Sequence, residues 1–214
     1  MRWFRDAFCD AEVERAAREG RDAYGLMEEA AAAVPVGSNG IVPIFSNLMN
    51  AKHWVHASPS FLGFDVGHPE RSGRRECIRA IEESAAYVAR GHLRIIEDLT
   101  GHIFEEAVFT GGASKGSLWP QIVADVLGVP VRIPVVREST SLGAAMCAGV
   151  GAGLYPDLDE AARRIVRFER TVDPEMAAHI QYDDLYERWA AVYGRQLEIA
   201  EAGLLPPLWR AAGT

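Results

Sequence analysis

The sequence predicts an α/β domain with a largely parallel sheet flanked by helices. Three features indicate this class: short apolar runs typical of buried strands, longer segments with apolar residues three or four positions apart, and glycines between the two kinds of segment. Strands separated by helices of this length imply crossover connections, so that neighbouring strands run in the same direction.

Each expected element has its own signal. The predicted strands are short apolar runs at residues 41–45, 61–64, 105–110 and 129–134. The predicted helices, which carry apolar residues at helical spacing or abundant alanine, cover residues 3–33, 74–100, 117–127, 138–149, 157–166 and 174–202. One domain is expected over residues 1–203, followed by a tail at 204–214 that leaves the fold.

Glycine and proline set the expected boundaries in the first half of the chain. Gly20 and Gly25 should divide the first helical segment into pieces, and Gly101 should end the long helix before it. Pro43 places its strand at a sheet edge or at a strand end, because proline has no N–H to donate. Since an α/β domain usually begins on a strand, a helical beginning suggests a segment of a longer protein.

Glycine and proline also set the expected boundaries in the second half of the chain. Pro120 falls within the first turn of helix 117–127, where a missing N–H costs nothing, and Gly128 should end that helix. Strand 129–134 contains prolines and is expected near a sheet edge. Segment 138–149, rich in glycine and alanine, is expected to pack closely against a sheet or another helix rather than to touch a ligand.

Composition restricts the partners. The 214 residues carry 22 Lys and Arg against 30 Asp and Glu, a formal net charge of −8 that argues against a nucleic-acid partner. No apolar stretch approaches the roughly 20 residues of a membrane span, and the first residues lack the apolar core of a signal peptide. Cys9, Cys77 and Cys147 are far apart, so free thiols and a cytoplasmic location are expected. No zinc spacing is found, and no metal ligand is predicted.

One stretch joins a strand to a helix through small residues: Val108-Phe109-Thr110-Gly111-Gly112-Ala113-Ser114-Lys115-Gly116-Ser117. Glycine has no Cβ and tolerates positive φ, so such a turn lets the main chain approach a ligand closely. It also directs the free N–H groups of the next helix at whatever occupies the turn. The same glycines could instead serve a tight turn alone. Their spacing is neither that of a Walker phosphate loop nor that of the three-glycine dinucleotide fingerprint.

Four motifs in order resemble the C-terminal domain of the FGGY carbohydrate kinases. They are a Gly-Gly-Ala turn, a Gln-x-x-x-Asp helix, a Val-Pro strand and a Glu-x-x-x-Leu-Gly-Ala-Ala helix, beginning here at Gly111, Gln121, Val129 and Glu138. The strand at 41–45 and the opening Arg2-Trp3-Phe4-Arg5-Asp6 also match this family, so the resemblance covers nearly the whole chain. Within the family, the opening and the turn are most similar to the autoinducer-2 kinases.

This resemblance implies an actin-like ATPase, or ribonuclease-H-like, domain that holds most of a nucleotide. ATP is the implied cofactor, with Mg²⁺ expected to reach the site on the phosphates. The implied nucleotide-binding residues are Gly111, Gly112, Ala113, Ser114 and Gly116. The first three would pass under the adenine and ribose, while Gly116 stands where glycerol kinases have an asparagine.

The sequence names no catalytic residue. Phosphoryl transfer usually needs a carboxylate that accepts the hydroxyl proton. The family's Gly-Asp-Gln and Asp-x-Gly-Thr motifs are not found in this sequence. Asp125 lies one helical turn after Gln121, where a structural pair is favoured over a catalytic one. The resemblance places the catalytic base and most sugar contacts in an N-terminal domain missing from this chain.

The expected function is that of the nucleotide-binding C-terminal domain of an ATP-dependent carbohydrate kinase. The full enzyme would phosphorylate a hydroxyl of a sugar, of the autoinducer-2 type used in quorum sensing, and the isolated chain is expected to be inactive. A second hypothesis is a stand-alone half-kinase that acts as a regulatory or binding module or pairs with a separate N-terminal half. A third is an unrelated α/β fold. The expected partners are ATP or ADP and the sugar, without nucleic acid or membrane, and an exposed apolar cleft face leaves a homodimer open.

Overall fold

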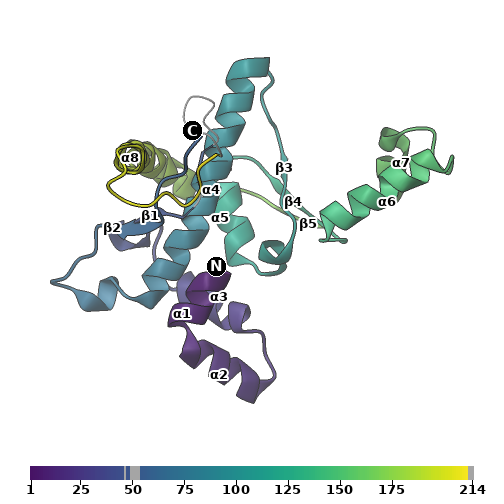
Figure 1. Cartoon of the computed structure of the whole chain (residues 1–214). Coiled ribbons are helices and arrows are strands. Elements are labelled where there is room, and N and C mark those ends of the chain that lie inside the picture. Colours follow the sequence, from purple (N-terminus) through teal and green to yellow (C-terminus); the bar gives the residue numbers. More distant parts are fainter. Residues whose placement is uncertain (46, 49–53, 212–214) are drawn as a thin grey trace.

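The computed structural model describes residues 1–45, 47–48 and 54–211, and its central element is the long helix α4, Arg74–Thr100 (Figure 1). The other helices are α1 Arg2–Phe8, α2 Asp10–Glu19, α3 Ala23–Ala32, α5 Leu118–Leu127, α6 Ser139–Gly151, α7 Leu158–Ile165 and α8 Met176–Glu201. The strands are β1 Val42–Ile44, β2 Ser60–Leu62, β3 Ala107–Val108, β4 Val131–Pro134 and β5 Phe168–Val172.

Two apolar clusters meet on α4. Its first turns pack with α1 and α3, and its middle packs with β1, α5 and α8. Trp189 of α8, which is 1% exposed, lies at the centre of the second cluster among Tyr87, Tyr186 and Tyr193. Its Nε1 donates a hydrogen bond to the Pro43 carbonyl at 2.7 Å, so this buried polar atom is satisfied.

The helices with the strongest sequence signals are confirmed. α4 has the predicted bounds and ends at Gly101, whose φ of 68° is left-handed. α5 carries Pro120 in its first turn and ends at Gly128, with a φ of 72°. The Asp157 carboxylate caps α7 by accepting a hydrogen bond from the Glu160 N–H at 2.7 Å. These ends are local features, which explains why the sequence alone predicts them.

The first helical segment divides differently from the prediction. Gly20 ends α2 with a φ of 64°, as expected, but Gly25 lies inside α3 and does not interrupt it. The other break is at Cys9, between α1 and α2. Glycine costs a helix only about 1 kcal/mol relative to alanine. Burial of Leu26 and Met27 in α3 outweighs that cost.

The α/β class is confirmed, but the expectation of a largely parallel sheet is wrong. Among the described strands, β1 and β2 form an antiparallel pair, while the second sheet has the order β3-β4-β5. In that sheet β3 and β4 are parallel and β4 and β5 are antiparallel. The single helix α5 carries the chain back to start β4 beside β3. After β4, the two helices α6 and α7 bring the chain back to the same end of the sheet at which β4 finished. The next strand, β5, therefore runs antiparallel to β4.

The strand β5 was not predicted, and its presence corrects the place of β4. Because β5 covers one side and β3 the other, β4 is the central strand rather than an edge strand. Its prolines lie just before the strand and at its last residue, where fewer ladder bonds are lost. β5 alternates half-buried Phe168, Arg170 and Val172 with exposed Glu169 and Thr171, a period of two that indicates a strand.

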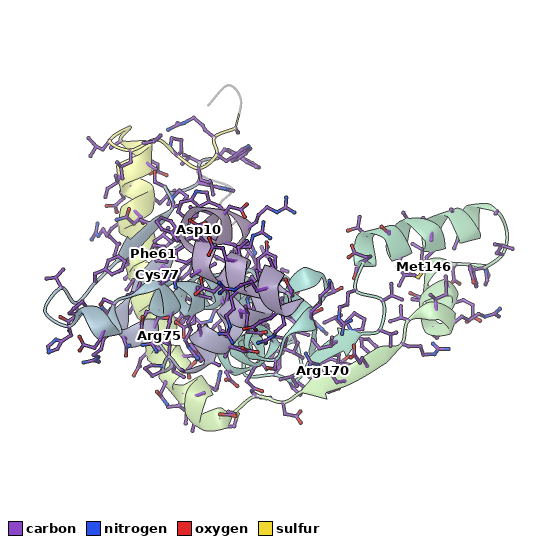
Figure 2. The ribbon with its side chains drawn as sticks, turned by 90° about the horizontal axis from the view of Figure 1, so that it is seen from below. Asp10, Phe61, Arg75, Cys77, Met146 and Arg170 are labelled. Carbon is purple, nitrogen blue, oxygen red and sulfur yellow. The ribbon has the colours of Figure 1, made fainter. Side chains whose placement is uncertain are left out.

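The helices α6 and α7 form a hairpin that stands off from the rest of the chain (Figures 1 and 2). Met146 marks α6 in Figure 2, far from the side chains of the central helices. The prediction that the small-residue helix packs against another helix is confirmed by its contacts with α7. A Cβ on Gly149 would lie 2.9 Å from the Tyr155 ring, whereas Ala144, Ala145 and Ala148 are exposed.

The expectation that the tail leaves the fold is wrong for its described part. The His56 N–H donates to the Trp209 carbonyl and the Ala211 N–H donates to the Trp54 carbonyl, each at 2.8 Å. Val55 and Arg210 thereby form an antiparallel bridge. The last three residues lie outside the described part of the chain. Whether residues 1–203 act as one domain stays a prediction.

Candidate nucleotide site

The glycine turn lies between β3 and α5, as predicted. Gly111 has a φ of 83°, a left-handed conformation that favours glycine, and its N–H donates to the Arg137 carbonyl at 3.0 Å. The Ser114 side chain is fully buried and donates to the Gly111 carbonyl at 2.8 Å. The Ser114 hydroxyl therefore links the two ends of the Gly111–Ser114 segment, while Gly112 and Lys115 stay exposed.

A side chain from β5 fixes the far end of the turn. Arg170, which is labelled on β5 in Figure 2, donates to the carbonyls of Ser114 and Gly116. On the other side, the Thr110 hydroxyl donates to the Arg137 carbonyl at 2.8 Å. The turn is thus held by both neighbouring segments of the sheet, which restricts its conformation before any ligand binds.

The turn forms one wall of a cavity of about 500 Å³. The cavity is lined by Met1, Asp22, Tyr24, Gly25, Met27, Glu28, Glu82, Gly112, Ala113, Lys115, Gly116 and Trp119. The structure therefore brings Gly112, Ala113 and Gly116 of the predicted set to the cavity, whereas Gly111 and Ser114 are not among its lining residues. A Cβ on Gly112 would meet no atom within 4 Å, so the bend is open rather than filled by the protein.

Glu28 of α3 explains the glycine at position 116. Its Oε1 accepts hydrogen bonds from the main-chain N–H groups of Leu118 at 2.7 Å and Trp119 at 3.2 Å. A carboxylate at this place satisfies free N–H groups and complements the positive end of the α5 dipole. A Cβ on Gly116 would overlap that carboxylate. A side chain at position 116 would therefore have to displace a cap supplied by a distant helix.

The cavity is acidic. Asp22, Glu28 and Glu82 line it together with Lys115. Glu82 is 3% exposed, and its Oε2 is buried without a hydrogen-bond partner among the described residues. Burial, and then the charge of Glu28, raise the pKa of the Glu82 carboxyl to about 8, against an opposing effect of Arg79. Near neutral pH this side chain is mostly an uncharged acid.

A second polar atom on the cavity wall is also unpaired. Trp119 lines the cavity, and its Nε1 is buried without a hydrogen-bond partner among the described residues. The rest of the wall, from Tyr24, Met27 and the glycines, is aromatic, apolar or bare main chain. This combination suits a flat, largely apolar ligand with a few polar groups at its edge.

Asp125 and Gln121 form the structural pair that the sequence suggested. The Gln121 Nε2 donates to Asp125 Oδ1 at 2.8 Å, and the Glu175 N–H donates to the same oxygen at 2.7 Å. Burial raises the pKa of Asp125, while these hydrogen bonds lower it. Neither residue lines the cavity. The pair joins α5 to the start of α8.

Metal ligands do not gather in the described part of the chain, where no group of three or more His, Cys, Asp or Glu side chains is placed to hold an ion. In the same residues, no helix combines the length and apolar character needed to cross a membrane.

Sequence reasoning missed the two glutamates of the cavity. Glu28 lies 90 residues before the helix that it caps, and no local pattern links them. The position of Glu82 in the sequence could have identified it. It stands four residues after Ile78, on the apolar stripe of α4 where a charged residue is unexpected. A buried acid on such a stripe is a candidate site residue.

An open glycine turn between a strand and a helix, facing a cavity, is an arrangement suited to a small ligand in an α/β fold. The model of the FGGY family of carbohydrate kinases, C-terminal domain, matches residues 1–152, and the chain belongs to this family.

Among its relatives, the autoinducer-2 kinase of Klebsiella pneumoniae is 47% identical over 213 residues, which cover 100% of this chain and 40% of the relative. The chain therefore spans well under half the length of that kinase. A xylulose kinase from Rhodospirillum rubrum has a similar structure, with a TM-score of 0.63 and 28% identity over 81% of this chain and 34% of that one. Plasmodium falciparum glycerol kinase with ADP shares the fold, with a TM-score of 0.60 and 17% identity over 78% of this chain and 33% of that one.

Proposed function

We propose that this chain is the nucleotide-binding part of an ATP-dependent carbohydrate kinase that phosphorylates a hydroxyl of an autoinducer-2 type substrate. The observation that carries the proposal is the open cavity against Gly112, Ala113 and Gly116. Kinases of the FGGY family use ATP or ADP. The substrate class rests on the identity to the K. pneumoniae kinase, which covers the whole of this chain.

The charges of the cavity favour one end of the nucleotide. Asp22 and Glu28 would repel a triphosphate and Lys115 offsets that repulsion only in part, whereas a base and ribose are uncharged. We therefore assign the cavity to the base and ribose, with the phosphates extending past the glycine turn toward solvent. Mg²⁺ would arrive on those phosphates, because it commonly binds through phosphate oxygens and water. In this chain the turn binds and orients the nucleotide, and no described residue is assigned the proton transfer.

The proposal is tested by titrating the purified chain with ADP in a calorimeter and comparing Gly112→Leu. A leucine at this position projects into open space at the cavity wall, so we expect about tenfold or greater weakening of ADP binding. Gly151→Leu is the matched control, because a Cβ there also meets no atom within 4 Å but the residue is away from the cavity. If the unchanged chain binds no nucleotide, or Gly112→Leu binds ADP as tightly, the proposal is wrong.

A second candidate function, a half-kinase that pairs with a separate polypeptide, is favoured by several exposed apolar side chains. Exposed apolar side chains follow the path from the end of α4 through β3 to the segment after β4: Leu99, Ile103, Val108, Val135 and Val136. Among the described strands, β3 pairs with β4 alone, so its other edge is open. Exposed apolar residues of this kind fit contact with the remainder of an FGGY kinase, since this chain aligns with only 40% of its relative.

We expect the 214-residue chain alone to give no ATP-dependent phosphorylation of the sugar above background. Mixing it with the part of the K. pneumoniae kinase outside the aligned region should restore phosphorylation and co-elution in gel filtration. Robust turnover by the chain alone would contradict the need for that remainder. An inactive mixture whose parts do not associate would argue for a regulatory module instead.

A further inference from the structure

Two adjacent glutamates on α4 are used in different ways. Glu83 is fully engaged, accepting hydrogen bonds from the Arg79 Nε, the Gly37 N–H and the Ser38 hydroxyl. Glu82 is equally buried and yet has an unpartnered Oε2, and its side chain lines the cavity. A buried carboxyl without a partner costs free energy, so its place at the wall of an open cavity points to a ligand.

The surroundings of Glu82 keep it uncharged. Glu28 and Glu83 face it with negative charge, while Arg79 and the amino group of Met1 oppose them. Burial is the largest influence, and the pKa of about 8 leaves the carboxyl protonated near neutral pH. A protonated carboxyl differs from a carboxylate because it has one O–H donor and one carbonyl acceptor side by side.

We propose that Glu82 reads the edge of the nucleobase, donating one hydrogen bond to a ring nitrogen and accepting one from an exocyclic amino group. Adenine presents such an acceptor beside such a donor. This inference rests on the proposed nucleotide function and goes beyond it by naming the residue that selects the base. The glycine turn supplies space without selectivity, because its main chain offers the same surface to any flat base.

The test measures dissociation constants of the 214-residue chain for two ligands, ADP and the same nucleotide without its 6-amino group, purine riboside diphosphate. Glu82→Leu removes both hydrogen-bonding groups, so ADP binding should weaken about tenfold or more, whereas the purine analogue should lose much less. Glu82→Gln keeps a donor and an acceptor at the same place and should bind ADP within about threefold of the unchanged chain.

A pH series separates recognition from a merely structural role. Ionisation removes the O–H donor, so ADP binding by the unchanged chain should weaken between about pH 6 and about pH 9, while Glu82→Gln should not follow that trend. Equal losses for ADP and the purine analogue in Glu82→Leu would overturn the inference, as would unchanged ADP binding. If Glu82→Leu fails to fold, the inference is tested instead by comparing ADP with the purine analogue in the unchanged chain and in Glu82→Gln. An unchanged chain that binds neither ligand would instead overturn the proposed function itself.

Discussion

Replacing Glu83 with alanine is expected to lower the free energy of unfolding by about 3–5 kcal/mol, because it leaves a buried guanidinium without its counter-charge. Glu83 and Arg79 are one helical turn apart on α4 and both are buried, with 2.9 Å between Arg79 Nε and Glu83 Oε1. Arg79 also donates to the Val34 carbonyl and to the Tyr182 hydroxyl, each at 3.0 Å. Without Glu83, the Arg79 guanidinium would be a buried charge with no counter-ion.

The same carboxylate holds the loop before β1. Its oxygens accept hydrogen bonds from the Gly37 N–H at 2.9 Å and the Ser38 hydroxyl at 2.7 Å. Ser38 and Asn39 have φ values of 49° and 54°, a left-handed conformation that is unfavourable for residues other than glycine. Loss of Glu83 therefore removes the contacts that hold this strained loop against α4.

Urea unfolding followed by circular dichroism measures the change. Glu198→Ala is the matched control, because Glu198 belongs to an exposed ion pair with Arg195 on α8 and should cost under about 1 kcal/mol. The double variant Arg79→Met/Glu83→Leu should recover part of the lost stability, since it removes the stranded charge but not the unpaired loop groups. A cost for Glu83→Ala as small as that of the control would contradict a buried network.

Replacing Glu82 with glutamine is expected to stabilise the chain at about pH 8 by on the order of a few kcal/mol and to flatten its pH dependence. The pKa of this carboxyl rises from an ordinary 4.5 to about 8 on folding. Between these values the folded chain keeps a proton that the unfolded chain has released. Stability from this group is therefore fully present below about pH 4.5 and is lost as pH rises through about 8.

Thermal unfolding at about pH 5, 6.5 and 8 checks this sign. The advantage of Glu82→Gln over the unchanged chain should grow with pH, because glutamine cannot ionise. Glu198→Gln, an exposed change on α8, should leave the pH dependence of the unchanged chain in place. A Glu82→Gln advantage that stays constant or shrinks toward pH 8 would show that the carboxyl is already ionised in the folded chain.

Local signals carried most of the fold prediction. α4 and α5 follow from apolar spacing and from terminal glycines, and the open turn follows from Gly111 and Gly112. β5 has a period of two, but its charged residues and its position before a long helix concealed it. Without β5, the direction of the sheet and the place of β4 could not be predicted, because pairing depends on partners distant in sequence.

The sequence by itself determined the class of the fold, the ends of α4 and α5, the family and a turn bare enough to accept a ligand. The tertiary structure decided which side chains face that turn. Glu28 caps α5 from α3, Arg170 holds the turn from β5, and Glu82 enters the cavity from α4. The physical reason is that helix ends and glycine turns depend on residues that are close together in the sequence. The state of a carboxyl, engaged like Glu83 or free and protonated like Glu82, depends instead on burial and charges that only packing brings together.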